Sequence, residues 1–244
     1  VVITNQPNAA TVDENTTATF TTLGSVTMAP VGGNAASSSF DTDQFDTPSG
    51  GGGGGFEGQS SHEPTVTYQW EKSDNAGANW STLGGATSAS YTTSTLTYAD
   101  DNADQYRCVI SAVGAAADAT TNAVALTVQR TFSITAQPSN ATANEGATGS
   151  FTVSTTSSSG TVTYQWERSD DAGANYASVG ATGQAAAFTT PTLVFANDNA
   201  DRYRVVASLV GAAASITSTH GELTVLRVIS ISAQPTSTAV IEGQ

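Results

Sequence analysis

Side chains suited to acid–base catalysis are few in this chain. Only two histidines occur among the 244 residues, and one of them belongs to the contiguous run Ser60-Ser61-His62-Glu63. A Ser–His–acid site is normally assembled from separated segments that a rigid frame holds together. This run instead follows a glycine-rich stretch. The sequence therefore predicts no catalytic residue and no enzyme activity.

Metal and phosphate sites are also not predicted. Asp41, Asp43 and Asp46 carry carboxylates of the kind that calcium prefers, but they lack the full spacing of a calcium-binding loop. We interpret them as a solvated acidic loop. The glycines at positions 50–55 lack the Lys-Ser/Thr pair and the following helix of a phosphate-binding loop. We expect no metal and no cofactor.

The charge balance bears on the class of partner. Seven basic residues face 21 acidic ones, which gives a formal net charge of −14. Binding to phosphate backbones needs clustered Lys and Arg side chains that displace counterions, so we expect no nucleic-acid partner. No apolar run approaches the ~20 residues that span a bilayer, and we expect no membrane insertion. Strong self-repulsion suits a soluble, exposed surface.

The elements that would carry any site are repeated along the chain. Tyr106 and Tyr203 lie 97 positions apart, as do Gln137 and Gln234. A unit of this length is a whole domain and not a short solenoid repeat. The repeated motifs are Tyr68-Gln69-Trp70-Glu71 with Tyr164-Gln165-Trp166-Glu167, Asp101-Asn102-Ala103-Asp104 with Asp198-Asn199-Ala200-Asp201, and Ala136-Gln137-Pro138 with Ala233-Gln234-Pro235. We predict one domain over residues 1–130, a second over 131–227, and the first strand of a third, truncated repeat over 228–244.

The first copy carries an insertion over about residues 24–63, which the second copy lacks. It is rich in Gly and Ser and joins two predicted strands, so it should protrude at one end of its domain. One interpretation is a tolerated flexible insertion. The other is a contact loop for a partner, with aromatic and acidic side chains as the contacts. These candidate contact residues are Phe40, Asp41, Asp43, Phe45, Asp46 and Phe56.

The hydrophobic pattern indicates an all-β protein. Thr, Val, Ser, Tyr and Phe are frequent, and segments such as 65–70 and 162–166 alternate between two faces. Many short strands at regular spacing favour a β-sandwich. We predict strands at 2–5, 17–22, 66–72, 94–98, 105–113 and 118–128, with copies at 133–136, 149–155, 162–168, 192–195, 202–210 and 215–225.

The residues resemble an immunoglobulin-like domain in each copy. Trp70 and Trp166 lie where that fold buries a tryptophan between its sheets, and Tyr106 and Tyr203 lie at the position of its tyrosine corner. The resemblance implies tandem immunoglobulin-like sandwiches without disulfides, because Phe20 and Phe151 take the place of the first cysteine. It also implies that the cores contain Phe20, Trp70, Tyr106, Phe151, Trp166 and Tyr203. Cys108 would then be a small buried hydrophobe, and Asn102, Asp104, Asn199 and Asp201 would bond the backbone of the turn before the tyrosine.

A narrower resemblance is to tandem immunoglobulin-like repeats of tailed-phage virion proteins and of bacterial surface proteins. The residues that carry it are Tyr68–Trp70, Ser73–Gly77, Gly85–Thr87, Tyr91–Thr93 and Tyr106–Val109. It implies an exposed, non-enzymatic module for display, spacing or adhesion, and it does not choose between phage and bacterium. Our first hypothesis is a structural part of a tailed-phage virion, an exposed capsid or tail-fibre module for spacing and weak attachment. The alternative is a bacterial adhesin or extracellular filament subunit at the cell surface. Partners would be other virion or surface-assembly proteins and a cell-surface glycan. A third hypothesis, an enzyme-borne carbohydrate-binding module, has only the aromatic residues Trp80 and Tyr176 on a loop to support it.

The junctions between copies contain no glycine or proline. Residues 126–134 run from the last strand of one copy into the first strand of the next, and residues 223–231 repeat this pattern. A joint of this composition should be stiff, and each has one basic residue, Arg130 or Arg227. Residues 228–244 therefore either begin a further domain or pair with a neighbouring subunit as an added strand.

Overall fold

The computed structural model describes residues 1–26, 65–238 and 242–243. Its Cα packing divides the chain into two compact units. The first comprises Val1–Val12, Thr17–Ser94 and Asp101–Thr127, and the second comprises Asp13–Thr16, Thr95–Asp100 and Val128–Gln244. The unit boundaries therefore differ from the predicted repeat boundaries at two short segments, which pack with residues of the second copy.

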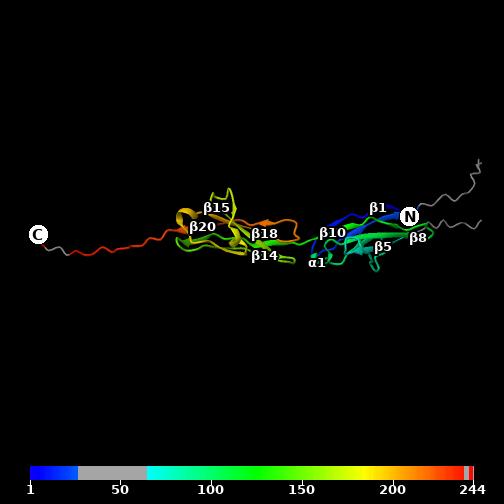
Figure 1. The fold of residues 1–244 in the computed structure, drawn as a ribbon, viewed down its shortest axis with the longest axis horizontal. Helices are drawn as coiled ribbons and strands as arrows, with labels where there is room; N and C mark the ends of the chain where they lie inside the picture. The colour runs from blue at the N-terminus through cyan, green and yellow to red at the C-terminus, as the bar shows by residue number, and fades with distance from the viewer. Residues whose placement is uncertain (27–64, 239–241, 244) are drawn as a thin grey trace, which may run out of the picture. The chain divides into compact units, whose positions relative to one another are not determined.

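Within residues 1–26 and 65–130, the first copy of the repeat has ten short strands and one helical turn, several of which are labelled in Figure 1. They are β1 (Val2–Asn5), β2 (Ala10–Asp13), β3 (Thr19–Thr21), β4 (Leu23–Ser25), β5 (Val66–Ser73), β6 (Ser81–Thr82), β7 (Ser90–Thr92), α1 (Tyr98–Asp101), β8 (Gln105–Ala112), β9 (Ala119–Thr120) and β10 (Val124–Gln129). The larger sheet has the order β2-β10-β8-β5-β6, with β9 also paired to β8. The long antiparallel pair β5–β8 runs in register from Val66↔Ala112 to Ser73↔Gln105.

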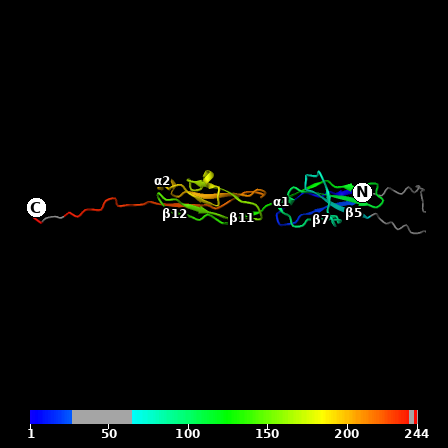
Figure 2. The same cartoon turned by 60° about the horizontal axis from the view of Figure 1, so that its bottom comes forward.

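The second copy repeats this plan (Figure 2). Its elements are β11 (Phe132–Ala136), β12 (Ala141–Asn144), β13 (Ser150–Thr152), β14 (Ser154–Ser157), β15 (Thr163–Ser169), β16 (Ala177–Ser178), η1 (Gly180–Gly183), β17 (Ala187–Thr189), α2 (Phe195–Asp198), β18 (Arg202–Ser208), β19 (Ile216–Thr217) and β20 (Gly221–Leu226). The sheet order β12-β20-β18-β15-β16 matches that of the first copy. Here β12 pairs parallel to β20, while the other pairs in this sheet are antiparallel.

Two predicted strands are wrong, because the chain forms helical turns there. The strands predicted at 94–98 and 192–195 lie earlier, as β7 and β17, and α1 and α2 follow them. Leu96 is buried, but its N–H donates to the Thr16 carbonyl across a loop and not along a strand ladder. The Asp100 N–H then donates to Thr97 Oγ1 at 3.3 Å, as at the start of a helix. An apolar–polar alternation over five residues does not distinguish this arrangement from a strand.

Other predicted strands are interrupted where a side chain bonds the backbone. The strand at 17–22 divides at Thr22, whose Oγ1 donates to the Asn5 carbonyl at 2.7 Å. The chain then changes partner, since β3 pairs with β7 and β4 pairs with β1. The strand at 118–128 divides at Thr121, whose Oγ1 accepts the Cys108 N–H at 2.9 Å. Beside this break, Gln6 Oε1 accepts the Asn122 N–H at 2.9 Å.

The Gln-Pro motif therefore has a structural role in both copies. Gln137 Oε1 accepts the Thr219 N–H at 2.9 Å, as Gln6 does for Asn122. In each case the glutamine side chain satisfies a backbone donor at the break in the last strand.

Each core is organised around a tryptophan. Trp70 is 0% exposed, and its Nε1–H donates to the Ser88 carbonyl at 2.9 Å. Phe20 stacks on Tyr106 with ring centroids 4.5 Å apart and lies 6.2 Å from Trp70. In the second copy, Trp166 Nε1–H donates to the Ala185 carbonyl at 2.9 Å. Its neighbours Phe151 and Tyr203 are likewise buried and stacked, at 4.7 Å.

The fold is all-β, and the chain forms tandem immunoglobulin-like β-sandwiches without disulfides. The first-cysteine position holds Phe20, which packs on aromatic rings instead of bonding sulfur. Cys108 is free and fully buried. Burial raises the pKa of its thiol to about 11, so it packs as a small apolar side chain, as Val205 does in the second copy.

Replacing Trp70 by Ala should reduce the free energy of unfolding of the first copy by about 3–5 kcal/mol, because a large buried ring and its hydrogen bond are lost. Urea denaturation followed by far-UV circular dichroism would measure the change. Val113→Ala is the matched control, since Val113 is 91% exposed. Equal stability of the Trp70→Ala and control proteins would contradict this account of the core.

Candidate functional site

The predicted contact loop cannot be placed from this structure. Phe40, Asp41, Asp43, Phe45, Asp46 and Phe56 lie outside the described residues, as does His62. His220, the other histidine, is exposed just before β20. Within the part of the chain that the structure describes, no group of three or more His, Cys, Asp and Glu side chains is placed to hold a metal ion.

A Glu–Arg–aromatic cluster lies on the same face of the larger sheet in both copies. In the first, Arg107 on β8 donates through Nε to Glu71 Oε2 on β5 at 2.7 Å. Its guanidinium also lies over the ring of Trp80, 4.1 Å from the centroid. These contacts form because Glu71 and Arg107 face each other in the β5–β8 register. The cation–π contact and the ion pair hold the aromatic ring against the sheet.

The second copy has the same cluster with a smaller ring. Arg204 donates through Nε to Glu167 Oε2 at 2.8 Å and lies over Tyr176, 3.7 Å from the ring centroid. Trp80 and Tyr176 are half-buried, so each ring keeps a solvent-facing part. The two aromatic candidates named from the sequence are thus anchored on the sheet and not loose on a flexible loop.

A tight loop before each aromatic residue fixes its position. Ser169 Oγ donates to Asp171 Oδ1 at 2.7 Å, and the same oxygen accepts the Asn175 N–H at 2.8 Å. Asn75 takes the place of Asp171 in the first copy and accepts the Asn79 N–H at 2.8 Å. These hydrogen bonds lower the pKa of Asp171 to about 2, the Asn175 N–H contributing most. Gly173 has a φ of 90°, which the turn requires and which L side chains rarely adopt.

Each copy has an ion pair between a cation on a strand and a buried aspartate of the turn before the repeated tyrosine, Tyr106 or Tyr203. In the second, Arg168 Nε lies 2.6 Å from Asp201 Oδ2 and Arg168 Nη2 lies 3.6 Å from Asp198 Oδ1. In the first, Lys72 Nζ lies 2.5 Å from Asp104 Oδ2 and 3.3 Å from Asp101. Asp104 and Asp201 are 3% and 2% exposed. The sequence predicted that these aspartates bond the backbone of the turn, whereas the structure pairs their Oδ2 atoms with cations on the strands.

The asparagine of the same turn does bond backbone. Asn199 Oδ1 accepts the Val225 N–H on β20 at 2.9 Å. The signal that sequence reasoning overlooked is the basic residue two positions after each buried tryptophan, Lys72 or Arg168. In a strand, residues two apart share a face, so a cation at that position points to the same side of the sheet as the tryptophan and needs a counter-charge.

A cleft of about 510 Å³ opens on the second unit next to this ion pair. Its walls combine the Tyr176 ring with carboxylate, amide and hydroxyl groups. The polar and aromatic lining residues include Arg168, Asp170, Asn175, Tyr176, Asp198 and Tyr203. Concave sites with an aromatic surface and a few convergent polar groups suit small polar ligands.

Residues 48–130 match a family described as a domain of unknown function (DUF8696). No curated protein matches. Within the described residues, no helix has the length and apolar character needed to cross a membrane.

Solved structures of tandem immunoglobulin domains are similar to this chain. A three-domain titin fragment, I67–I69 in an E-to-A mutated variant, has a TM-score of 0.45 at 13% identity over 92% of this chain. The N-terminal four immunoglobulin domains of Dscam1 give 0.40 at 13% identity, covering 89% of this chain and 43% of that one. The Drosophila DLAR Ig1-2 module gives 0.32 at 14% identity, covering 92% and 97%.

The chain spans 65% of the length of the titin fragment. None of these three TM-scores reaches 0.5. The fold assignment therefore rests on the sheet topology and the cores described above.

Replacing Asp201 by Asn should flatten the dependence of stability on pH between about 4 and 6. Burial raises the pKa of Asp201 to about 6, although Arg168 opposes the shift. The folded state thus binds this proton more tightly than the unfolded state. The contribution of Asp201 to the free energy of unfolding is therefore greatest below about pH 4 and is lost as pH rises through about 6. The effect should be about 1–3 kcal/mol. Urea denaturation at several pH values measures it.

Asp171→Asn provides the control for that experiment, because Asn75 already serves the same loop in the first copy. The pKa of Asp171 is lowered, so this group changes stability only below about pH 4. In Asp171→Asn the dependence of stability on pH between about 4 and 6 should therefore persist. A parent-like slope in Asp201→Asn would contradict the assignment of the proton to Asp201.

Proposed function

We propose that this chain is a non-enzymatic structural and display module, exposed on the virion of a tailed phage as part of the capsid surface or a tail fibre. One observation carries the proposal: the side chains that recur between the copies are used by the fold itself. Gln6 and Gln137 bond backbone, Trp70 and Trp166 fill cores, and the Glu–Arg pairs anchor aromatic rings. A repeat whose shared residues stabilise the fold is suited to setting the distance between other groups and to holding them at a surface.

The exposed location is supported by charge and by the sequence resemblance. A net charge of −14 on 244 residues keeps copies apart and soluble at high local density. The repeated motifs resemble those of phage virion and bacterial surface proteins. The alternative is a bacterial adhesin or filament subunit. The exposed apolar side chains of Ile229 and Ile231 favour that alternative, since an apolar segment that follows the last strand can pair as an added strand with a neighbouring sheet.

Immunogold labelling distinguishes the two locations. Antibodies raised against the chain should label the outside of intact virions in electron micrographs, because the proposal places the modules in contact with solvent. Virions of an unrelated phage are the negative control. Label confined to the bacterial cell surface would support the adhesin or filament alternative and reject the virion assignment.

Weak attachment to a surface glycan is the second part of the proposal. The cleft beside Tyr176 supports it, because one wall is an aromatic ring and the others carry Asp170, Asn175 and Arg168. Sugars are bound by stacking on such rings together with directed hydrogen bonds. The cleft is open, so affinity per module should be low, and repetition along an assembly would raise the avidity.

Tyr176→Ala should reduce binding of the full chain to an array of bacterial surface polysaccharides by at least about fivefold, since about 1 kcal/mol of stacking would be lost. Trp80→Ala is the matched control, because Trp80 holds the same place in the first copy. Melting curves would check that both variants fold. Undiminished binding in Tyr176→Ala would place attachment elsewhere, and equal loss in both variants would show that both rings contribute and that the cleft of the second unit is not required.

A further inference from the structure

A carboxylate, an aromatic ring and an arginine meet at one end of the second compact unit. Glu14 is 8% exposed, and its Oε1 accepts the Tyr98 N–H at 3.0 Å. Two adjacent hydroxyls complete its coordination: Ser158 Oγ donates to Oε2 at 2.6 Å, and Ser159 Oγ lies 2.7 Å from the same oxygen. These bonds, with Ser158 contributing most, lower the pKa of Glu14. Both oxygens of the Glu14 carboxylate therefore accept hydrogen bonds, from the Tyr98 N–H and from the loop that follows β14.

Arg130 completes this cluster. Its guanidinium lies over the Tyr98 ring, 4.2 Å from the centroid, and its Nε donates to Ser159 Oγ at 2.9 Å. Its backbone N–H donates to the Gly211 carbonyl at 2.9 Å. All of these residues belong to the second unit as its packing defines it. We call Glu14, Tyr98 and Arg130 the occupied acceptor, because they hold the Ser158–Ser159 loop.

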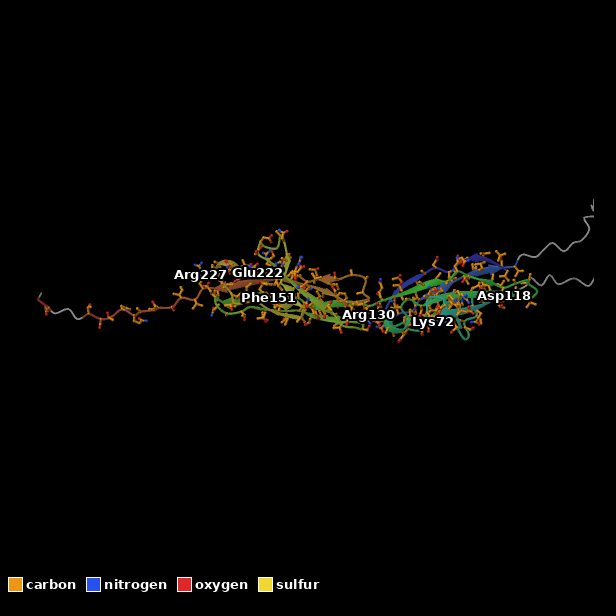
Figure 3. All side chains as sticks on the ribbon, viewed as in Figure 1. Lys72, Asp118, Arg130, Phe151, Glu222 and Arg227 are labelled. Carbon is orange, nitrogen blue, oxygen red and sulfur yellow. The ribbon has the colours of Figure 1, made fainter. Side chains whose placement is uncertain are left out.

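The same three-part arrangement recurs 97 to 131 positions later in the sequence, formed by Glu145, Phe195 and Arg227. Glu145 Oε1 accepts the Phe195 N–H at 3.1 Å, and Arg227 lies over the Phe195 ring, 4.2 Å from its centroid. The backbone matches as well: the Glu145 N–H donates to Leu226 and the Glu14 N–H to Gln129, at 2.8 and 2.7 Å. Figure 3 shows Arg130 and Arg227 at opposite ends of the second unit.

The second arrangement differs from the first in being open. Glu145 and Arg227 are exposed, whereas Glu14 is buried and Arg130 half-buried. Among the described residues, no hydroxyl donates to Glu145 and no carbonyl accepts the Arg227 N–H. The carboxylate and the guanidinium are nevertheless already held in place by Phe195. A partner would thus meet a preorganised surface and lose little side-chain entropy on binding.

The residues after Arg227 repeat the first strand of the second copy. Ile229 and Ile231 correspond to Phe132 and Ile134 of β11. In β11 these positions are half-buried: Ile134 packs against the core, and Phe132 pairs with Ser157 of β14. Ile229 and Ile231 instead are 93% and 73% exposed. Apolar side chains at strand positions, without a sheet to cover them, mark a surface that a further sandwich would bury.

We propose that Glu145, Phe195 and Arg227 form an acceptor for one more immunoglobulin-like module of the same repeat. That module uses residues 228–233 as its own first strand. The loop after its β14-like strand presents two adjacent hydroxyl side chains to Glu145, and a carbonyl of its β18–β19 connection accepts the Arg227 N–H. This inference rests on the repeated acceptor and stands whether the assembly is a virion, a cell surface or a filament.

The test extends the chain with a known copy of the module. In the extended protein, residues 228–244 are replaced by a second copy of residues 131–227, which restores the Arg-Thr-Phe sequence of the first junction. Amide hydrogen exchange of Arg227 is followed by NMR in this protein and in the 244-residue chain. The proposal expects exchange of the Arg227 amide to slow by at least about tenfold on extension, because its N–H gains a carbonyl acceptor.

Variants in the extended protein separate docking from folding. Glu145→Ala should return the Arg227 amide to fast exchange, and so should Ala at both positions of the added copy that match Ser158 and Ser159. Glu222→Ala is the control, since Glu222 lies on β20 of the same unit and pairs with Arg202. It should leave the slow exchange unchanged. Unfolding curves of each variant verify that the second copy remains folded.

Two results would overturn the proposal. Fast exchange of the Arg227 amide in the folded extended protein would show that the added module does not dock on the acceptor. Concentration-dependent oligomers of the 244-residue chain that disappear in Ile229→Ser would show that residues 228–233 complete a sheet in another subunit instead. Light scattering of the parent and the variant distinguishes that outcome from the monomer that we expect.

Discussion

The structure of each copy depends on one constraint, which is that a buried tryptophan must also satisfy its indole N–H. Trp70 and Trp166 reach the carbonyls of Ser88 and Ala185 on the chain that follows the β5–β6 and β15–β16 pairs. This fixes the spacing between the two sheets and positions the aromatic rings of Phe20 and Phe151 over the tyrosines. Because the inward-facing side chains of these strands form the core, their outward-facing side chains can form the Glu–Arg pairs that contact the half-buried rings of Trp80 and Tyr176.

Much of the fold could be predicted from residue types and period. The tryptophan and tyrosine positions followed from the resemblance, and the strands predicted at 66–72 and 105–113 are the ones that pair as β5 and β8. What sequence reasoning missed were features determined by single side-chain bonds. The hydroxyls of Thr22 and Thr121 make contacts where a predicted strand is interrupted, and the Thr97 hydroxyl accepts a hydrogen bond at the start of α1. Threonine is abundant in this chain, so composition does not mark which of its hydroxyls interrupts a strand.

The site was harder to predict than the fold. Trp80 and Tyr176 could be named from the sequence as aromatic residues on a loop, but their anchoring depends on arginines that lie in a neighbouring strand. The ion pairs of Lys72 and Arg168 join residues about thirty positions apart, and a local turn motif suggested another role for their aspartates. The cleft in the second unit is formed by the meeting of a loop, a strand and the residues before α2. Such surfaces depend on tertiary placement, which periodicity does not encode.

The absence of a disulfide between the two sheets affects the compartments in which such modules can fold and remain stable. Many extracellular sandwiches fold fully only after oxidation joins their two sheets. Here aromatic stacking of Phe20 on Tyr106 fills that place, and the single thiol, at Cys108, is sealed in the core. Stability is thereby uncoupled from redox potential, because no covalent link is made or broken between compartments. The same chain can complete its folding in a reducing cell interior and keep that structure unchanged in an oxidising exterior.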